Sequence, residues 1–285
     1  MKRLRVVHTT GYRYVESVTA SYNEARMLPI SSDAQLVLHS AVEVSPVSSH
    51  HQYTDYWGTR VLAFDILDAH RELTITASSL VEVLESAGSE PGVGWEELRA
   101  AIPRSAGCVE QLGQTPLTEP SASLAELAAS VLEATDPAVD GPCAAARAIV
   151  ASVSSEMEYM SGVTGVRTTA AEAWEARSGV CQDIAHVAIG ALRSIGIPAR
   201  YVSGYLHPKI DAVVGETVTG ESHAWVEWYC GTWHGYDPTN GVEIGDRHIR
   251  IGHGRDYSDV TPLRGVYAGG ASSDLFVQVS ITREA

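Results

Sequence analysis

The stretch that decides the fold places a cysteine at the start of an apolar run, and it reads Gly179-Val180-Cys181-Gln182-Asp183-Ile184-Ala185-His186-Val187-Ala188-Ile189. Because Gly196 and Pro198 follow the run, the pattern predicts a helix from Cys181 to Ile195. Apolar residues cover nearly all of its faces, which is typical of a helix buried at the centre of a domain. A thiol in its first turn would sit on a rigid support, with only the helix tip near solvent.

Cys181 can be interpreted either as a nucleophile or as an inert packed thiol. A helix N-terminus presents unpaired backbone N–H groups and a partial positive charge, and both stabilise a thiolate. Free cysteine is also among the most buried residue types, where it behaves as a small apolar side chain. The helix alone leaves both interpretations open. The choice depends on which side chains the rest of the chain brings to the cysteine.

A pair of strands after the helix supplies an imidazole and a carboxylate. Residues 222–229 and 232–237 alternate in the manner of strands and flank a turn at Cys230-Gly231. If the loop consists of residues 229–231, His223 lies directly opposite Asp237. Directly opposed side chains have Cβ atoms about 4.5–5.5 Å apart, which is within hydrogen-bonding reach. A slip of one residue would place the two on opposite faces, so this prediction depends on the loop length.

Together, Cys181, His223 and Asp237 have the composition of a catalytic triad. An adjacent imidazole takes the proton of the thiol and later gives it to the leaving group. The carboxylate holds the imidazole in the productive tautomer, and the backbone N–H of Cys181 is a natural oxyanion donor. The alternative hypothesis is that His223 and Asp237 form a purely structural pair, or do not meet at all.

Composition excludes several classes of partner. The chain has 285 residues and a formal net charge of −15, which argues against nucleic acid and against an anionic membrane surface. The sequence contains no apolar run long enough to span a bilayer and no segment with the features of a signal peptide. We therefore expect a cytoplasmic location, with no nucleic-acid partner and no membrane partner.

The cysteines do not suggest a metal site. Cys108, Cys143, Cys181 and Cys230 show no C-x-x-C spacing, which argues against a zinc ribbon or a redox dithiol. Their even number permits disulfides, but a chain of this length does not need them, and we expect Cys143 to pack within a helix. His186, on the apolar helix, is expected to belong to the core. No metal and no cofactor are predicted.

The chain before the central helix divides by composition. Residues 1–88 contain several short alternating runs, which predict a small antiparallel β-sandwich domain. Glycine and proline punctuate residues 89–120, which indicates a connecting segment with one short helix around Trp95–Ala101. Residues 121–285 form the predicted catalytic core.

Four blocks of sequence resemble the bacterial transglutaminase-like family, and they are Gly179–His186, Gly196–Tyr205, Ser222–Glu227 and Asp237–Gly241. They match in order and at family-like spacing, the N-terminal β region is similar as well, and the match is weakest across residues 85–140. The resemblance implies an α+β, papain-like transglutaminase core preceded by an antiparallel β-sandwich domain. It also implies that Cys181 is the nucleophile, His223 the base and Asp237 the orienting carboxylate. The resemblance extends to the C-terminal part and implies that the strand at 275–281 completes the sheet of this core.

The resemblance further implies thiolate attack on an amide carbonyl and a thioester intermediate. Transglutamination, deamidation and proteolysis share this step and differ in whether water or an amine arrives second. We favour hydrolysis, as a protease or amidase acting on a peptide or protein, because a cytoplasmic enzyme meets water far more often than a presented amine. The alternatives are a protein-glutamine γ-glutamyltransferase and a catalytically inactive peptide-binding module.

A second oxyanion donor in this kind of enzyme is often an aromatic side chain upstream of the cysteine. Tyr159 and Trp174 are both candidates, and of the two Trp174 is expected to pack in the core. The sequence contains no EF-hand-like loop that would supply a calcium site.

Overall fold

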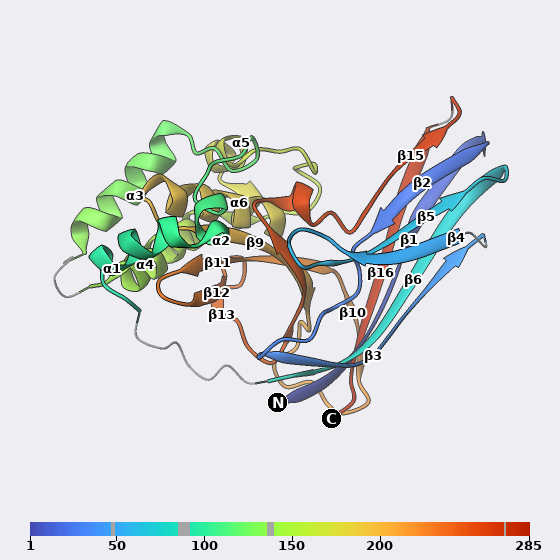
Figure 1. Ribbon diagram of the computed structural model, residues 1–285, viewed down its shortest axis with the longest axis horizontal. Helices are drawn as coiled ribbons and strands as arrows, with labels where there is room; N and C mark the ends of the chain where they lie inside the picture. The colour runs from blue at the N-terminus through green and yellow to red at the C-terminus, as the bar shows by residue number, and fades with distance from the viewer. Residues whose placement is uncertain (47–48, 85–91, 136–139, 271) are drawn as a thin grey trace.

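The computed structural model describes residues 1–46, 49–84, 92–135, 140–270 and 272–285. It consists of helices packed on a sheet, beside a second region built from long strands, and the two chain termini lie close together (Figure 1). This is the α+β transglutaminase-type core with an antiparallel N-terminal β region that the sequence predicts. The predicted boundary at residues 88–89 lies outside the described residues, so the division of the chain at that point stays a prediction.

The helices follow the sequence pattern closely, and they are α1 (Trp95–Ala101), η1 (Ile102–Arg104), α2 (Ala106–Glu110), α3 (Ala122–Ala134), α4 (Pro142–Glu156), α5 (Ala170–Ala176), α6 (Cys181–Ser194) and η2 (Tyr257–Asp259). The short helix expected at Trp95–Ala101 is confirmed. The central helix begins at Cys181, as predicted, and ends one residue before Ile195. Among the described residues, no helix is both long and apolar enough to cross a membrane.

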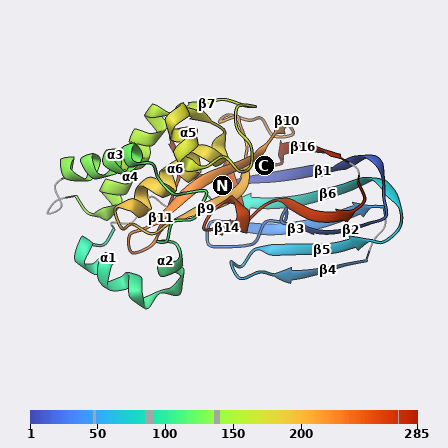
Figure 2. The same cartoon turned by 90° about the horizontal axis from the view of Figure 1, so that it is seen from above.

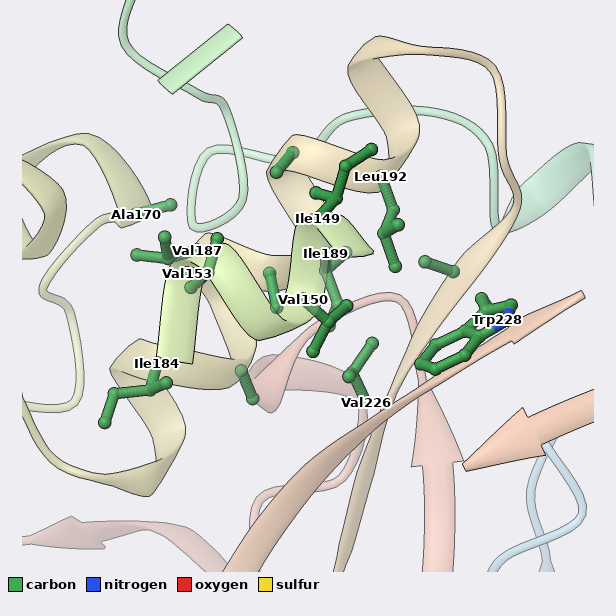
Figure 3. Close-up of a cluster of buried hydrophobic side chains, with 14 of the residues drawn as sticks. Ile149, Val150, Val153, Ala170, Ile184, Val187, Ile189, Leu192, Val226 and Trp228 are labelled. Atoms are coloured by element: carbon green, nitrogen blue, oxygen red, sulfur yellow. The ribbon is translucent and has the colours of Figure 1, made fainter. Parts of the chain in front are cut away.

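Helix α6 lies at the centre of the helical region. Every residue from Gln182 to Arg193 is buried, and α6 contacts α3, α4 and α5 as well as the sheet below. Figure 3 shows its apolar side chains between those of α4 and those of the sheet, where Val226 and Trp228 point toward it. Burial of each large apolar side chain in this cluster contributes about 1.5–3 kcal/mol. The predicted rigid support for Cys181 is therefore confirmed.

The sheet beneath α6, here called the catalytic sheet, is antiparallel and has the strand order β13-β12-β11-β9-β14. Its strands are β9 (Ala199–Leu206), β11 (Ser222–Tyr229), β12 (Trp233–Asp237), β13 (Val242–Glu243) and β14 (His248–Gly254). A separate pair of short parallel strands, β7 (Glu158–Tyr159) and β8 (Ser178–Gly179), precedes the cysteine. Pairing of β7 with β8 joins the segment before α5 to the start of α6.

The register of the β11–β12 hairpin differs from the prediction by two residues. Tyr229 pairs with Trp233, so the loop is 230–232 and not 229–231. Gly231, with φ +102°, lies in the middle of this loop and takes the left-handed conformation that glycine accepts without a steric cost. His223 is therefore diagonal to Asp237 and not directly opposite it. Because the shift is an even number of residues, both side chains remain on the same face.

The predicted β-sandwich is confirmed, and its two antiparallel sheets have the orders β10-β16-β1-β6-β3 and β15-β2-β5-β4. The strands are β1 (Lys2–Val18), β2 (Ala20–Ala25), β3 (Gln35–Ser45), β4 (Ser49–Thr54), β5 (Arg60–Ile66), β6 (His70–Val83), β10 (Thr217–Gly220), β15 (Leu263–Ala268) and β16 (Ser273–Arg283). Strand β16 pairs with β1 along most of its length. The predicted strand at 275–281 thus completes the N-terminal sheet and not the catalytic sheet.

One face of the β1-containing sheet is buried in two places. Near the start of β1, Leu4 packs with Tyr205 of β9 in the catalytic sheet. Near the other end, Tyr14 packs with Phe64 of β5 inside the sandwich. Seen from above, the helices and the sandwich strands lie at opposite ends of the molecule with β9 and β14 between them (Figure 2). The middle of β1 therefore lies beside the catalytic sheet, close to the start of α6.

A disulfide joins α4 to the catalytic hairpin. Cys143 on α4 pairs with Cys230 of the β11–β12 loop, with 5.6 Å between their Cα atoms, while Cys108 and Cys181 are free. The expectation that Cys143 only packs is wrong, because folding brings together two residues 87 positions apart. Disulfides persist mainly in oxidising compartments. The cytoplasmic location stays a prediction.

Candidate active site

Cys181 and His223 line a cleft of about 380 Å³ between the helical region and the β-sandwich. The tip of α6 and the start of β11 form one side of this cleft. The other side comes from the middle of β1 and from β16, which contributes Leu275, Val277 and Val279. The β-sandwich region, for which the sequence offered no role, thus supplies one wall of the cleft.

A cap on α6 fixes the position of Cys181. The carboxylate of Asp183 accepts a hydrogen bond from the Val180 N–H at 2.8 Å and from the Thr164 hydroxyl at 2.6 Å. A Cβ at position 179 would lie 2.7 Å from the Asp183 Cβ, so Gly179 is required for this close approach. Burial raises the pKa of Asp183. This capping role was missed by the sequence analysis, although an acidic residue at the third helical position is a recognisable capping signal.

The imidazole of His223 is bound to one member of the predicted triad and lies beside the other. Its Nε2 lies 2.7 Å from Asp237 Oδ2, and His223 lines the same cleft as Cys181. Burial of the ring lowers its pKa, but the hydrogen bond to Asp237 and the nearby side chain of Cys181 outweigh that effect and raise the pKa to about 9. The ring therefore carries a proton at neutral pH and presents a positive charge to the sulfur.

Asp237 is fully buried and accepts hydrogen bonds from several donors. Besides His223, these are Asn240 Nδ2 at 2.7 Å, the backbone N–H groups of Thr239 and Asn240 at 3.0 and 3.2 Å, and His248 Nε2 at 3.4 Å. Burial alone would raise the pKa of Asp237, but the hydrogen bonds from His223 and His248 hold it well below its usual range. The carboxylate is thus ionised and fixed in one orientation.

The sequence analysis missed His248 and Asn240. The Asp-Pro-Thr-Asn segment is a turn in which the first side chain accepts backbone N–H groups, so Asn240 had a local signal. His248 had no local sequence signal. It is the first residue of β14, and it reaches Asp237 only because of the path that the chain takes after β13. Its edge-to-face contact with Trp225, at 5.5 Å between ring centroids, holds the ring in place.

Tyr159 lies in the same cleft as Cys181. It pairs with Gly179 across β7 and β8, which places it near the tip of α6, and its side chain is 47% exposed. Burial raises its pKa, and the negative charges of Glu221 and Cys181 raise it further, so the phenol keeps its proton and can donate. Its role as an oxyanion donor stays a prediction. Trp174 is buried in the core, as expected, and its Nε1 donates to the Ser123 hydroxyl.

Two groups of side chains in the described part of the chain have the composition to hold a metal ion, and they are His223, Asp237 and His248, and Cys143, Cys230 and His234. In the first group the carboxylate already accepts hydrogen bonds from both imidazoles. In the second group the two sulfurs are bonded to each other. That the protein needs no metal or cofactor stays a prediction.

The reactivity of Cys181 toward iodoacetamide is expected to depend on pH through His223. Because the imidazolium persists up to about pH 9 in the same cleft as the sulfur, it favours negative charge developing on Cys181 during attack. We expect fast alkylation at pH 6–7, measured by mass spectrometry of the Cys181 peptide. In His223→Ala the rate should fall about tenfold at that pH, because the positive charge beside the sulfur is removed. Superimposable profiles for the two proteins would contradict an ion pair, and buried Cys108 serves as the unreactive internal reference.

Comparison with known proteins agrees with the fold. Residues 4–82 match the family model of the bacterial transglutaminase-like N-terminal region, and residues 126–238 match that of the transglutaminase-like superfamily. The chain is 46% identical to an uncharacterized protein of Mycobacterium leprae (strain TN) over 285 residues, covering 99% of both chains. It is 34% identical to an uncharacterized protein of Mycobacterium tuberculosis (strain ATCC 25618 / H37Rv), covering 98% of this chain and 92% of that one.

Among solved structures, the fold is similar to that of a protein from Cytophaga hutchinsonii described as a candidate cysteine protease. The TM-score is 0.75 at 19% sequence identity, over 99% of this chain and 97% of that one. The likeness extends over the whole chain, so it includes the β-sandwich as well as the helix-on-sheet core. With both family regions matched in order, the chain belongs to the transglutaminase-like superfamily and has the fold of its cysteine enzymes.

Proposed function

We propose that the protein is a cysteine hydrolase, a protease or amidase that cleaves amide bonds of a peptide or protein substrate. The observation that carries this proposal is that one imidazole, His223, is bound to the buried carboxylate of Asp237 and lines the same cleft as Cys181. This cleft is large enough for a few residues of a peptide. In the proposal Cys181 is the nucleophile, His223 the general acid and base, and Asp237 the orienting carboxylate.

The reaction would proceed in two halves. The Cys181 thiolate attacks the amide carbonyl, and the resulting oxyanion is stabilised by the backbone N–H of Cys181 and by the phenol of Tyr159. The C–N bond then breaks, the His223 imidazolium gives its proton to the departing amine, and a thioester remains. Water loses a proton to the now neutral imidazole, attacks the thioester carbonyl, and releases a carboxylic acid and the thiolate.

Water is the favoured second substrate because the cleft is open. The side chains of Leu275 and Val277 on its β16 wall are 56% and 54% exposed, so solvent reaches the thioester from that side. A transferase must keep water away while an amine approaches. The principal alternative remains a protein-glutamine γ-glutamyltransferase, which would use the same side chains with an amine as acceptor.

The product profile of the intact protein tests this proposal. Incubation with glutamine-containing peptides and a fluorescent primary amine is expected to give free carboxylic acid and ammonia or a shorter peptide, with little labelled product. Mass spectrometry of the peptides, together with an ammonia assay, separates these outcomes. Predominant incorporation of the amine would instead favour the transferase. Binding of peptides without any turnover would favour the inactive binding module.

A further inference from the structure

The cleft beside Cys181 contains a single carboxylate from an acidic residue and no lysine or arginine among its described lining residues. That carboxylate belongs to Glu221. Its side chain is exposed, and the partner that the structure gives it is the Tyr159 hydroxyl at 3.5 Å. A carboxylate without a cationic partner in a substrate cleft is a binding group for a positive charge.

Glu221 is held close to the reacting side chains. It joins β10, which pairs with β16 in the sandwich, to β11, which carries His223 two residues later. The charges of both Glu221 and Cys181 raise the pKa of Tyr159, and all three residues line the same cleft. A positive charge bound at Glu221 would therefore sit within a residue or two of a carbonyl placed at the sulfur.

The wall on β16 is apolar. Leu275, Val277 and Val279 alternate along the strand and so share one face, and all three line the cleft. The first two are more than half exposed, so the strip on this wall is available to a ligand. Apart from the reacting pair Cys181 and His223, the described lining of the cleft thus combines the Glu221 carboxylate with one apolar strip.

We propose, resting on the function proposed above, that the cleft selects acyl substrates with a cationic group next to the scissile amide and an apolar group beyond it. Glu221 binds the ammonium or guanidinium, and the β16 strip takes the apolar part. The cation can be a free peptide N-terminus or a lysine or arginine side chain. The net charge of −15 adds a field that attracts such substrates.

Thiol labelling tests the charge preference without any need for turnover. Cys181 is treated with methanethiosulfonates of similar size carrying an ammonium, no charge or a sulfonate, in the intact protein and in Glu221→Gln. We expect the ratio of cationic to anionic labelling rates to fall about fivefold in Glu221→Gln, because a unit charge at close range in water changes a rate by about this factor. The ratio cancels any change in thiolate fraction, and the amide keeps an acceptor for Tyr159.

The matched control is Glu126→Gln, which removes the same charge from an exposed position on α3. It should leave the labelling ratio within about twofold of the intact protein, since salt screens a distant charge. An unchanged ratio in Glu221→Gln, or an equal fall in both variants, would overturn the proposal.

Peptide turnover then identifies the source of the cation. Matched peptide amides carry a free N-terminus, an acetylated N-terminus, or an acetylated N-terminus with lysine beside the scissile bond. We expect Glu221→Gln to lower kcat/KM about fivefold for the cationic peptides and not for the neutral one. Equal turnover of all three by the intact protein would overturn the inference while leaving the hydrolase intact. Turnover that survives loss of Cys181 would instead overturn the proposed function.

Discussion

Replacement of Cys181 by alanine is expected to lower the kcat for amide cleavage by at least about 10⁴-fold, to the level of the uncatalysed background. The reason is that the proposed thioester cannot form without the sulfur, and the remaining oxyanion donors accelerate water attack only weakly. The measurement is steady-state peptide hydrolysis, followed by mass spectrometry for an acyl-enzyme in the intact protein.

The fold should survive this change. Cys181 is partly exposed at the first position of α6, and the cap that holds the helix start is made by Asp183 and Val180. The free energy of unfolding should therefore change by less than about 1 kcal/mol. Cys181→Ser is the matched variant of nearly the same size, and it should be inactive as well because a hydroxyl is far less acidic than a thiol. Near-normal turnover in either variant would remove the cysteine mechanism.

Local features of the site could be predicted from the sequence. The boundaries of α6 follow from an apolar run that ends at Gly196, and a helix of this composition has to be buried. The common face of His223 and Asp237 was also predicted correctly, although the assumed loop was wrong. This prediction survived because the period of a strand is two, so an even error in register keeps side chains on their face.

Features that depend on contacts between distant segments could not be predicted. The β16 wall of the cleft lies about one hundred residues after Cys181, and no local pattern says which sheet this strand joins. The same holds for His248 on Asp237 and for the pairing of Cys143 with Cys230. Each of these contacts depends on how distant segments pack in the folded chain. Hydrophobic patterns and secondary-structure propensities are local, so they do not encode this packing.

Conversion of Asp237 to asparagine is expected to lower kcat about 10³- to 10⁴-fold while Cys181 remains present. In the structure the carboxylate oxygen accepts from His223 Nε2, which fixes the orientation of the ring toward the thiol. An amide can turn its NH₂ group toward the ring and so favour the wrong tautomer. The corresponding change in a Ser-His-Asp triad costs about 10⁴-fold in kcat.

The same substitution should move the pH dependence of the enzyme in a defined direction. Burial lowers the pKa of His223, and the hydrogen bond to Asp237 is the leading effect that raises it to about 9. Without that charge the pKa of His223 should fall. The imidazolium then loses its proton at a lower pH, so the alkaline limit of activity should shift to lower pH. The depressed pKa of Asp237 also stabilises the fold at neutral pH, and this stability is lost as pH falls through its folded-state pKa.

A matched variant separates catalysis from stability. Asp33→Asn removes the same charge at an exposed position and should leave both kcat and its pH profile unchanged. Thermal unfolding of Asp237→Asn at neutral pH is expected to show a loss of a few kcal/mol, because several donors, including Asn240 and the backbone of Thr239, then face a weaker acceptor. Assays must therefore be made below its unfolding temperature. A folded variant with normal kcat and an unshifted alkaline limit would show that Asp237 only supports the turn, and that His223 acts without an orienting carboxylate.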